Sequence, residues 1–456
     1  MPLSQDKKRN ILTTIYLFIS LFGAFSQSTN SKEIDKYKKI CKEYIFRDYQ
    51  GMFKEPKGVL TYPYITPGSR TYSSQLWDWD SWFTGIALEQ ILLETGDPKK
   101  KAEGLKYQQG CVLNFLNFQR WGWIPILISH DSPAPDKYCP ENPHIVNMHK
   151  PMLAQQAAFI VKQNGGDAKW LDDKFEDLQF FVNHYINHQK HKETGLYFWM
   201  TDEAIGVDND PATFYRPNKS SANIFLNCLM YKELLAMNYL CKQLNRNEIG
   251  TFYAREAQEL KEAIQKNCWD EWTGYFYSCD LNLLPIQTPN KPWSLHSGNP
   301  RTYSCLIQRI HSFTGFMAMW AGIATPEQAK RMVSNHFRDS ATLNCNYGIR
   351  SLSKLEKMYD VRATGNPSSW LGPVWGISNY IVFRGLANYG YNEEATEMAH
   401  KTILLFGKDF EKTGNLHEYY LPDSGEPVLN KGFQNWNYLV INMMAWLDKK
   451  NVVAEF

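Results

Sequence analysis

The sequence lacks several features that identify common classes of protein. Lysine and arginine exceed aspartate and glutamate by only two residues in 456, and no long basic run occurs. This balance argues against a nucleic acid or an anionic membrane surface as the main partner. The nine cysteines are scattered and form no CxxC pair, so we expect mostly buried thiols. Cys268 and Cys279, which flank a predicted turn, are the candidate pair for a disulfide.

Motifs of enzymes that use a metal, a phosphate or an activated serine are also missing. No Gly-rich phosphate loop follows a predicted strand, and no GxSxG sequence occurs. His184, His188 and His191 have the i, i+4, i+7 spacing of metal ligands on a helix, but no HExxH motif accompanies them. The apolar stripe through Val182 and Tyr185 places them on the polar face. We therefore expect neither a metal nor another cofactor.

The N-terminus has the layout of a secretory signal peptide. "KKRN" at residues 7–10 precedes the apolar run "ILTTIYLFISLFGAF", and small or polar residues follow around residues 24–28. The run is shorter than the ~20 residues that span a membrane, although a retained anchor is the alternative. We expect a signal peptide at 1–26 and one domain at 27–456. The protein would then be periplasmic or secreted, with no membrane contact after signal removal.

Amphipathic helices account for most of the remaining chain. Leu171, Phe175, Leu178, Val182 and Tyr185 step by four, three, four and three residues, which is the helical period. The patterns come in consecutive pairs and predict an all-α toroid of six helical hairpins, an (α/α)6 barrel, with small local strands. An irregular all-α domain and a solenoid are alternatives, but no fixed-period repeat occurs. Helices are predicted at about 34–48, 75–96, 99–119, 149–164, 168–190, 219–245, 250–267, 305–323, 326–337, 374–390, 392–409 and 433–449.

Aromatic residues make up 14% of the chain, with 15 Trp and 26 Tyr. Trp and Tyr have a flat apolar face and a polar edge, which suits contact with sugar rings, although helix packing can account for many of them. In "QLWDWDSWF", Asp78 and Asp80 alternate with tryptophans at the start of a helix. In such pairs the aromatic ring can stack on a sugar and the acid can accept hydrogen bonds from its hydroxyl groups. The simpler interpretation is that the acids favour the helix dipole beside core tryptophans.

The stretch "EAIGVDNDPATF" displays carboxylates on a turn. Asp208, Asn209 and Asp210 lie between a glycine and a proline, and no Lys or Arg follows until Arg216. A carboxyl group held away from cations keeps its proton, as a general acid must, and repulsion from Asp210 would raise the pKa of Asp208 further. The alternative is an Asx turn that caps the next helix. A calcium loop is excluded because its closing Glu is absent.

Three further stretches place aromatic and acidic residues before helices or turns. "SSWLGPVWGISNY" contains Trp370 and Trp375 around a Gly-Pro turn. "LHEYYLPDSGEP" sets Glu418 among His417 and two tyrosines, and "GFQNWNYLV" opens the last helix with Trp436. In a helical ring, the long connections that hold these stretches would gather at one end, where sites usually lie.

In this order, the stretches resemble motifs of the inverting glycoside hydrolases with an (α/α)6 barrel. These are the trehalases, the mannosyl-oligosaccharide glucosidase family (family 63) and the mannosylglycerate hydrolase-like enzymes. The resemblance implies that Asp208 is the general acid, Glu418 the general base and Asp80 a sugar-binding acid. Two positions depart from the family pattern: Leu371 replaces an Arg, and Asp210 replaces a Ser. "QNWN" also stands where Phe-Gly-Trp-Ser is common.

The resemblance implies an inverting, exo-acting glycosidase for a small α-linked carbohydrate, with an α-glucoside as the first expectation. In such enzymes the two carboxyl groups lie about 6.5–9.5 Å apart, and only a closed ring could bring together residues so distant in sequence. Lys150 and Arg216 could bind a carboxylate such as that of a glycerate. The residues expected to bind substrate are Trp77, Trp79, Asp80, Trp123, Lys150, Arg216, Trp370, Trp375 and Trp436.

Four alternatives remain open at this point. A specific trehalase and a mannosylglycerate or glucosylglycerate hydrolase would use the same carboxylate pair. A sugar epimerase or polysaccharide lyase on the same toroid would depend on residues such as His149 or His417. A non-catalytic sugar-binding protein would keep the pocket without turnover.

Overall fold

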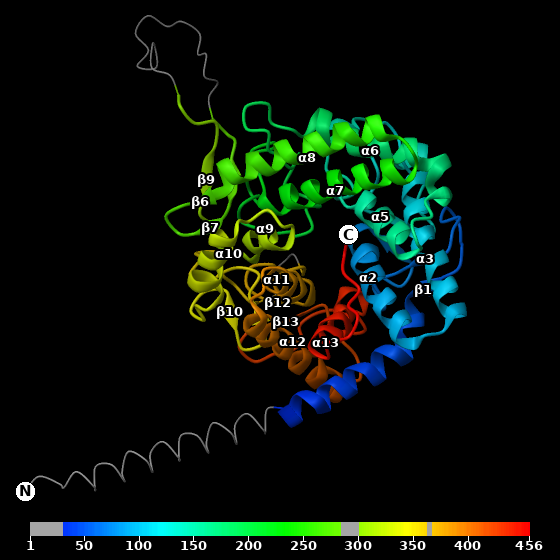
Figure 1. The fold of residues 1–456 in the computed structure, drawn as a ribbon, viewed down its shortest axis with the longest axis vertical. Coiled ribbons are helices and arrows are strands. Elements are labelled where there is room, and N and C mark those ends of the chain that lie inside the picture. Colours follow the sequence, from blue (N-terminus) through cyan, green and yellow to red (C-terminus); the bar gives the residue numbers. More distant parts are fainter. Residues whose placement is uncertain (1–30, 284–300, 363–366) are drawn as a thin grey trace, which may run out of the picture.

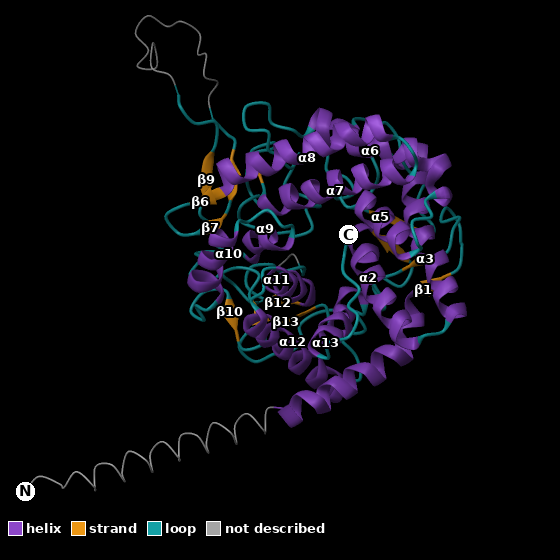
Figure 2. Ribbon diagram, in the orientation of Figure 1, coloured by secondary structure: helices purple, strands orange, loops and turns teal. Residues whose placement is uncertain are grey.

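The computed structural model describes residues 31–283, 301–362 and 367–456, and within them the helices form a closed double ring (Figures 1 and 2). Each inner helix contacts the next, and the last contacts the first. The predicted (α/α)6 barrel is therefore confirmed. The inner ring consists of α2 (Asp78–Thr95), α5 (Leu153–Gln163), α7 (Ile224–Gln243), α9 (Met317–Trp320), α11 (Gly376–Asn388) and α13 (Val440–Leu447).

The outer ring covers the inner one. Its first helix, at residues 31–48, packs on α12 through Tyr44 and Phe410, whose rings stack 4.8 Å apart. The first outer helix thus lies against the last one, which closes the outer ring. Its other helices are α3 (Pro98–Asn117), α6 (Phe175–His188), α8 (Asn247–Cys268), α10 (Pro326–Met332, continued by a π-turn at Val333–Phe337) and α12 (Asn392–Thr413).

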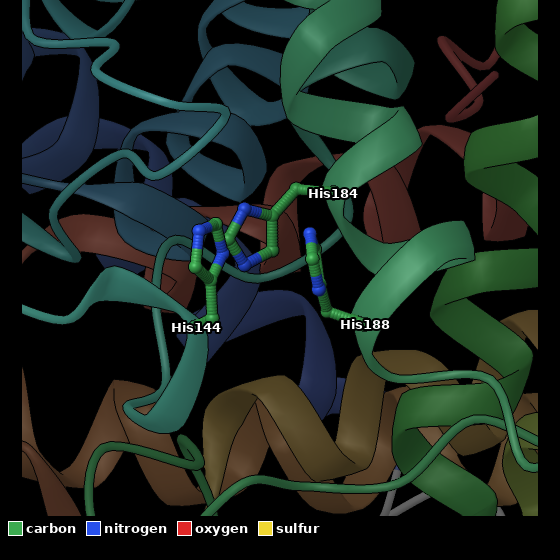
Figure 3. A group of neighbouring side chains, drawn as sticks. All are labelled: His144, His184 and His188. Carbon is green, nitrogen blue, oxygen red and sulfur yellow. The ribbon is translucent and has the colours of Figure 1, made fainter.

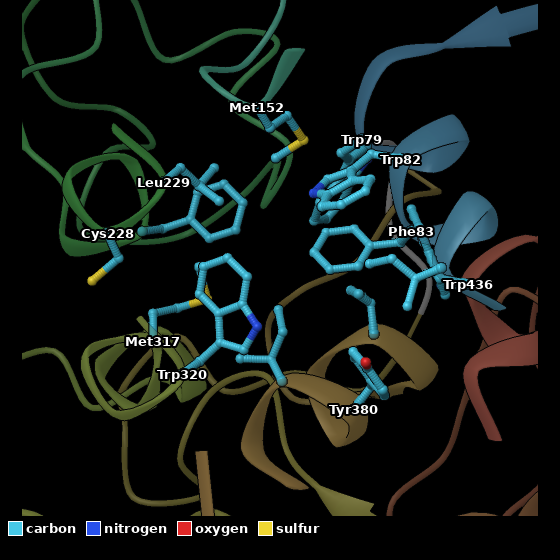
Figure 4. Packing of buried hydrophobic residues seen from close by; sticks show 14 of the residues in the cluster. Trp79, Trp82, Phe83, Met152, Cys228, Leu229, Met317, Trp320, Tyr380 and Trp436 are labelled. Atoms are coloured by element: carbon cyan, nitrogen blue, oxygen red, sulfur yellow. The ribbon is translucent and has the colours of Figure 1, made fainter. Parts of the chain in front are cut away.

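Burial explains why the two rings differ in sequence. In α2 every residue from Asp78 to Leu92 is buried, because the helix is enclosed by neighbours on all sides, and a helix of this kind is not amphipathic. The outer helices α8 and α12 are buried along one stripe only. Aromatic and sulfur-containing side chains from α2, α7 and α9, among them Trp82 and Trp320, face one another across the interior (Figure 4).

Local signals set the ends of several helices. Asp97 caps α3 by accepting the N–H of Lys99 at 2.9 Å, and Pro98 follows at the first helical position. Asn223 caps α7 in the same way through the N–H of Phe225. Gly96 ends α2 in the left-handed conformation. Such caps place the long loops, which carry the site, at fixed positions on the ring.

The strands of the described residues are short and antiparallel. Two pairs support the site: β3 with β4, and β12 with β13. Short connecting segments at Tyr49–Met52, Pro135–Tyr138, Lys169–Lys174 and Phe313–Phe316 are single helical turns or 3-10 helices. The strands are β1 (Phe53–Lys54), β2 (Tyr64–Ile65), β3 (Gln75–Trp77), β4 (Leu127–Ser129), β5 (Ser221–Ala222), β6 (Trp269–Asp270), β7 (Tyr275–Phe276), β8 (Ser278–Asp280), β9 (Leu306–Gln308), β10 (Asn344–Cys345), β11 (Gly348–Ile349), β12 (Val374–Trp375) and β13 (Tyr419–Tyr420).

One predicted helix is mostly wrong. The pattern at 305–323 is helical only from Phe313 to Trp320, because Leu306–Gln308 instead pairs with β8. The cysteines are all described and all free. The sulfur atoms of Cys268 and Cys279 are adjacent at 3.9 Å but are not bonded. Among the described helices, none has a stretch that is both long and apolar enough to span a membrane.

Candidate active site

A cavity of about 230 Å³ gathers residues from loops that are far apart in the sequence. The volume lies below the ~300–1,000 Å³ of sites for drug-sized ligands, so it suits one small ring. Nine of the eleven predicted site residues line it. The lining residues are Tyr72, Trp77, Trp79, Asp80, Ile126, Lys150, Gly206, Asp208, Ser368, Trp370, Trp375, Glu418, Phe433 and Trp436.

Asp208 lies in the loop between α6 and α7, and the two residues that follow it form hydrogen bonds that hold this loop in place. Asn209 accepts the backbone N–H of Trp370 at 2.7 Å, which joins two loops of the cavity. Asp210 accepts the N–H of Ala212 at 3.0 Å and the amide of Asn223 at 2.9 Å. The loop is therefore anchored directly after Asp208, which itself lines the cavity.

Gly206 allows the close approach of this loop to Lys150. Its φ of +87° is in the left-handed region, and a Cβ atom there would lie 2.4 Å from Cε of Lys150. The lysine stem thus lies against the loop two residues before Asp208.

Burial raises the pKa of Asp208. A hydrogen bond from Ser368 and the charge of Lys150 oppose this shift, while the negative charge of Asp78 adds to it. The prediction that Asp210 would raise the pKa by repulsion is wrong, because Asp210 is turned to Ala212 and Asn223 and does not line the cavity. The effect is largely one of desolvation.

Glu418 immediately precedes β13, which pairs with β12 so that Trp375 lies opposite Tyr419. The Glu418 side chain is 5% exposed. The hydroxyl of Tyr72 donates to its two oxygens at 3.3 and 3.4 Å, and the amide of Asn430 also donates to it. Burial raises the pKa of Glu418 to about 7, against the two hydrogen bonds, and the negative charge of Asp208 adds to the rise.

At the start of α2, two buried acids have different partners. Asp78 binds the ammonium group of Lys150 at 2.9 and 3.0 Å, and the two side chains are 0% and 3% exposed. This ion pair outweighs burial and lowers the pKa of Asp78. Asp80 instead accepts a hydrogen bond from Asn435, and burial raises its pKa well above the usual value. The cavity therefore receives little net positive charge from Lys150.

Tryptophans form the walls of the cavity. Trp370 and Trp375 stack with centroids 4.0 Å apart and planes 3° apart. The ring centroid of Trp79 lies 4.7 Å from that of Trp436 and 5.8 Å from that of Trp370. The indole N–H groups of Trp370 and Trp436 are buried without a partner among the described residues. Flat apolar faces with unused donors beside carboxylates suit a polyhydroxylated ring.

Two predicted residues do not reach the cavity. Trp123 is buried and donates its indole N–H to the carbonyl of Asn147 at 3.3 Å. Arg216 forms an ion pair with Asp280, on β8. Leu371, which replaces the arginine of the family motif, is buried and lies outside the lining.

The histidines of the alternative mechanisms also lie outside the lining. His149 is fully buried, and its Nδ1 contacts the carbonyl of Lys150 at 2.7 Å. Nδ1 of His417 lies 2.8 Å from the carboxylate of Asp409. Both imidazoles are thus bound to structural partners.

Sequence reasoning missed several residues that touch the cavity or its acids. Gly206, Ser368 and Phe433 lie within the recognised motifs, but no role follows from their residue types. Tyr72 and Asn430 lie outside them, and their pairing with Glu418 depends on contacts across 346 and 12 positions. No spacing rule in the sequence would have found them.

Curated relatives match parts of the chain. A cytosolic neutral trehalase of Kluyveromyces lactis is 27% identical over 237 residues, which is 49% of this chain and 28% of that protein. A mannosylglycerate hydrolase of Selaginella moellendorffii is 30% identical over 156 residues, 32% of this chain and 28% of that protein. The chain thus matches less than a third of the length of these relatives.

Solved structures confirm the fold. The mannosylglycerate hydrolase of Thermus thermophilus, solved with glucose, has a TM-score of 0.61 at 16% identity and covers 88% of this chain and 98% of its own. Neutral trehalase of Saccharomyces cerevisiae has a TM-score of 0.56 at 20% identity, with 86% and 74% coverage.

The prediction of an exported protein is wrong, because the matching relatives include cytosolic neutral trehalases of K. lactis and Neurospora crassa. That prediction depended only on the run after "KKRN". A short apolar run that follows basic residues is typical of a signal peptide, but this pattern alone does not establish export. The proposed signal peptide at 1–26 lies outside the described residues.

A family model also matches most of the chain. The mannosylglycerate hydrolase MGH1-like glycoside hydrolase domain matches residues 73–437, which include the lining residues from Trp77 to Trp436. The chain belongs to this family of glycoside hydrolases.

Proposed function

We propose that the protein is an inverting, exo-acting α-glycosidase in which Asp208 is the general acid and Glu418 the general base. The observation that carries this proposal is that the two carboxyl groups, 210 positions apart, line one small cavity walled by tryptophans. An inverting glycosidase needs one carboxylic acid to protonate the leaving oxygen and one carboxylate to activate water. A cavity for one ring favours cleavage at the end of a glycoside.

The electrostatics support the same division of roles. Both groups have raised pKa values because of burial, and the charge of Asp208 contributes to the shift of Glu418. When Glu418 loses its proton, its negative charge stabilises the protonated form of Asp208. The tyrosine and amide donors on Glu418 favour its charged form, as a base requires. Ser368 and Lys150 also favour the charged form of Asp208, but Lys150 is shared with Asp78, and burial still raises the pKa of Asp208.

The charges of the cavity indicate a neutral leaving group. Among the described lining residues, Lys150 is the cation, and its ammonium group is bound by Asp78. Arg216 is held by Asp280 outside the lining. Glu418 must be ionised to act as the base, so the working cavity contains a carboxylate and, among the described lining residues, no cation free of a counter-charge, and an anionic aglycone such as glycerate would be repelled. We therefore expect an α-glucoside with a neutral aglycone, such as trehalose, to be cleaved faster than mannosylglycerate.

The test is proton NMR of the protein with α-glucosides and α-mannosides, including trehalose and mannosylglycerate. Initial release of the β-anomer from one α-linked substrate would support inversion and identify the sugar. Release of the α-anomer would refute inversion. Consumption of a substrate with an unsaturated or epimerised product would instead favour a lyase or epimerase. Binding without turnover of any substrate would favour a sugar-binding protein.

Variants separate the two roles. Glu418→Gln should lose about 10²–10⁴-fold in rate on every substrate, since the base is needed throughout. Asp208→Asn should lose as much on substrates with poor leaving groups but far less on α-glucosyl fluoride, whose leaving group needs no protonation. Glu426→Gln is the matched control, because Glu426 lies on the same segment but is exposed and paired with Lys412. If Asp208→Asn affected both substrates equally, the assignment of the acid would be wrong.

A further inference from the structure

Three histidines that do not line the cavity lie close together (Figure 3). His184 and His188 are one turn apart on α6, and His144 comes from the short 3-10 helix Pro143–Ile145. One ring nitrogen from each lies within 4.8 Å of the other two. The sequence suggested His191 as the third member, but its Nδ1 instead bonds the hydroxyl of Thr194 at 2.9 Å. The third imidazole therefore comes from a different loop.

The hydrogen bonds of the cluster leave nitrogen lone pairs available. Nδ1 of His184 lies 3.1 Å from the carbonyl of Trp121 and must donate to it, so Nε2 carries the lone pair. A backbone carbonyl that fixes one nitrogen is the usual outer partner of a metal-binding histidine. Nδ1 of His144 is buried and has no hydrogen-bond partner in the described structure, which is uncommon for a buried polar atom.

The protonation states also suit a cation. Burial and the two neighbouring imidazoles lower the pKa of His184 to about 4, and burial and His144 lower the pKa of His188. Neutral imidazole is the form that ligates metal. Within the described residues the group contains no carboxylate, which disfavours Ca²⁺ and Mg²⁺, whereas an all-imidazole set suits Zn²⁺.

We propose that His144, His184 and His188 bind a Zn²⁺ ion. The site would have three imidazole ligands and a fourth position open to water on the side of His188, which is exposed. At Zn–N distances of ~2.0–2.1 Å the three nitrogens would move closer together. His144 stacks on both other rings, and the ring centroids of the three lie 4.2–5.0 Å apart, so the side chains would have to rotate to direct one nitrogen each at the ion.

The position of the site indicates what the ion would do. His144 lies in the long connection between α3 and α5, which also contributes Ile126 and Lys150 to the cavity. The ion would fasten this connection to α6. None of the three histidines is among the described residues that line the cavity. The ion would therefore act as a structural cross-link, called the clip below, that holds the α3–α5 connection against α6, and it would take no part in the chemistry.

The test uses the full chain freed of metal with a chelator and titrated with ZnSO₄ by calorimetry. We expect one tight equivalent in the wild type and at least a tenfold weaker affinity in His188→Gln, which alters an exposed residue and should fold normally. His191→Gln is the matched control on the neighbouring turn and should bind like the wild type. Cys279→Ser controls for zinc held by thiols, since Cys279 lies beside Cys268. No tight equivalent, or equal binding by His188→Gln, would overturn the site.

Hydrogen exchange tests the clip itself. Zinc should slow exchange of the backbone amides around residues 142–147 in the wild type and leave them unchanged in His188→Gln. Zinc binding without protection of this segment would refute the clip, because the ion would then not hold the loop. Substrate turnover is not needed for either measurement, so the result is independent of the proposed glycosidase activity.

Discussion

Removal of the Tyr72 hydroxyl should make the proposed base harder to ionise. In the structure this hydroxyl donates to both oxygens of Glu418, and Asn430 donates to the same carboxylate. Both hydrogen bonds favour the charged form of Glu418 and offset part of the burial that raises its pKa to about 7. Tyr72→Phe removes one donor and keeps the ring that packs against Trp77 and Phe433. The pKa of Glu418 must therefore rise.

The size of this shift follows from the strength of the lost bond. A hydrogen bond to a charged group contributes ~1.5–3 kcal/mol. The distances of 3.3 and 3.4 Å are long, and Asn430 still donates in the variant, so ~1 kcal/mol is a reasonable share. Since one pKa unit corresponds to about 1.4 kcal/mol, the pKa of Glu418 should rise by about 0.5–1 unit. Well below both pKa values, kcat/KM should fall about 3- to 10-fold.

The measurement is kcat/KM against pH, from about pH 5 to about pH 9, on the substrate found by NMR. The acidic limb of the variant should be displaced to higher pH, whereas the plateau above it should be nearly unchanged, because Glu418 is ionised there in both proteins. Tyr138→Phe is the control, since its hydroxyl donates to the carbonyl of Leu127 and not to an acid. A uniform loss at every pH, or a shift to lower pH, would refute the reasoning.

Two further predictions concern buried ion pairs. Asp78→Asn leaves Lys150 buried without a counter-charge, and it should lower the free energy of unfolding, measured in urea, by ~3–5 kcal/mol. The control Asp136→Asn breaks an exposed ion pair and should lower it by less than ~1 kcal/mol. Equal losses in the two variants would contradict a stabilising role for the buried Asp78–Lys150 pair. Glu455 is buried and paired with Arg384, which helps to lower the pKa of Glu455 below its usual value. The ionised carboxylate therefore stabilises the folded protein at any pH above the pKa that Glu455 has in the unfolded chain. This stabilisation is lost as the pH falls through the lower pKa that Glu455 has in the folded protein. The stability difference between wild type and Glu455→Gln should therefore be largest near neutral pH and shrink in acid, and a difference that grew in acid would reverse this sign.

Much of the fold could be predicted because the inner and outer helices have strong apolar patterns and clear ends. The exception at 305–323 shows the limit of that approach. A short apolar segment there joins β8 as an edge strand, with Cys279 opposite Ile307. Periodicity cannot separate a buried strand from a short helix when the segment is only a few residues long. The partner strand decides, and it is not visible from the local sequence.

The candidate site could be predicted only as far as its motifs extend. Asp208 and Glu418 were found because of the resemblance, and both do line the cavity. The role of Asp210 was misjudged because a carboxylate on a turn can face a ligand or the backbone, and only the fold shows that it binds Asn223. Arg216 was misjudged for a similar reason, since its partner Asp280 is 64 positions away. His144 had no helical spacing to connect it with α6.

The site depends on closure of the whole ring. Asp80, at the start of the first inner helix, accepts a hydrogen bond from Asn435, and Thr84 donates to the same amide across 351 positions. Asp208 enters from the loop before α7, and Glu418 from the segment after α12. No contiguous half of the chain contains Asp80, Asp208, Glu418 and Asn435 together.

This arrangement explains how several acids can lie in one small space. Burying them is unfavourable unless each has a partner, and each partner here comes from another loop: Lys150 for Asp78, Asn435 for Asp80 and Tyr72 for Glu418. The partners fix the acids only when the ring is complete. The raised pKa values that suit acid–base chemistry are therefore a product of the closed fold, and a change that loosens the ring should alter the pH profile before it unfolds the protein.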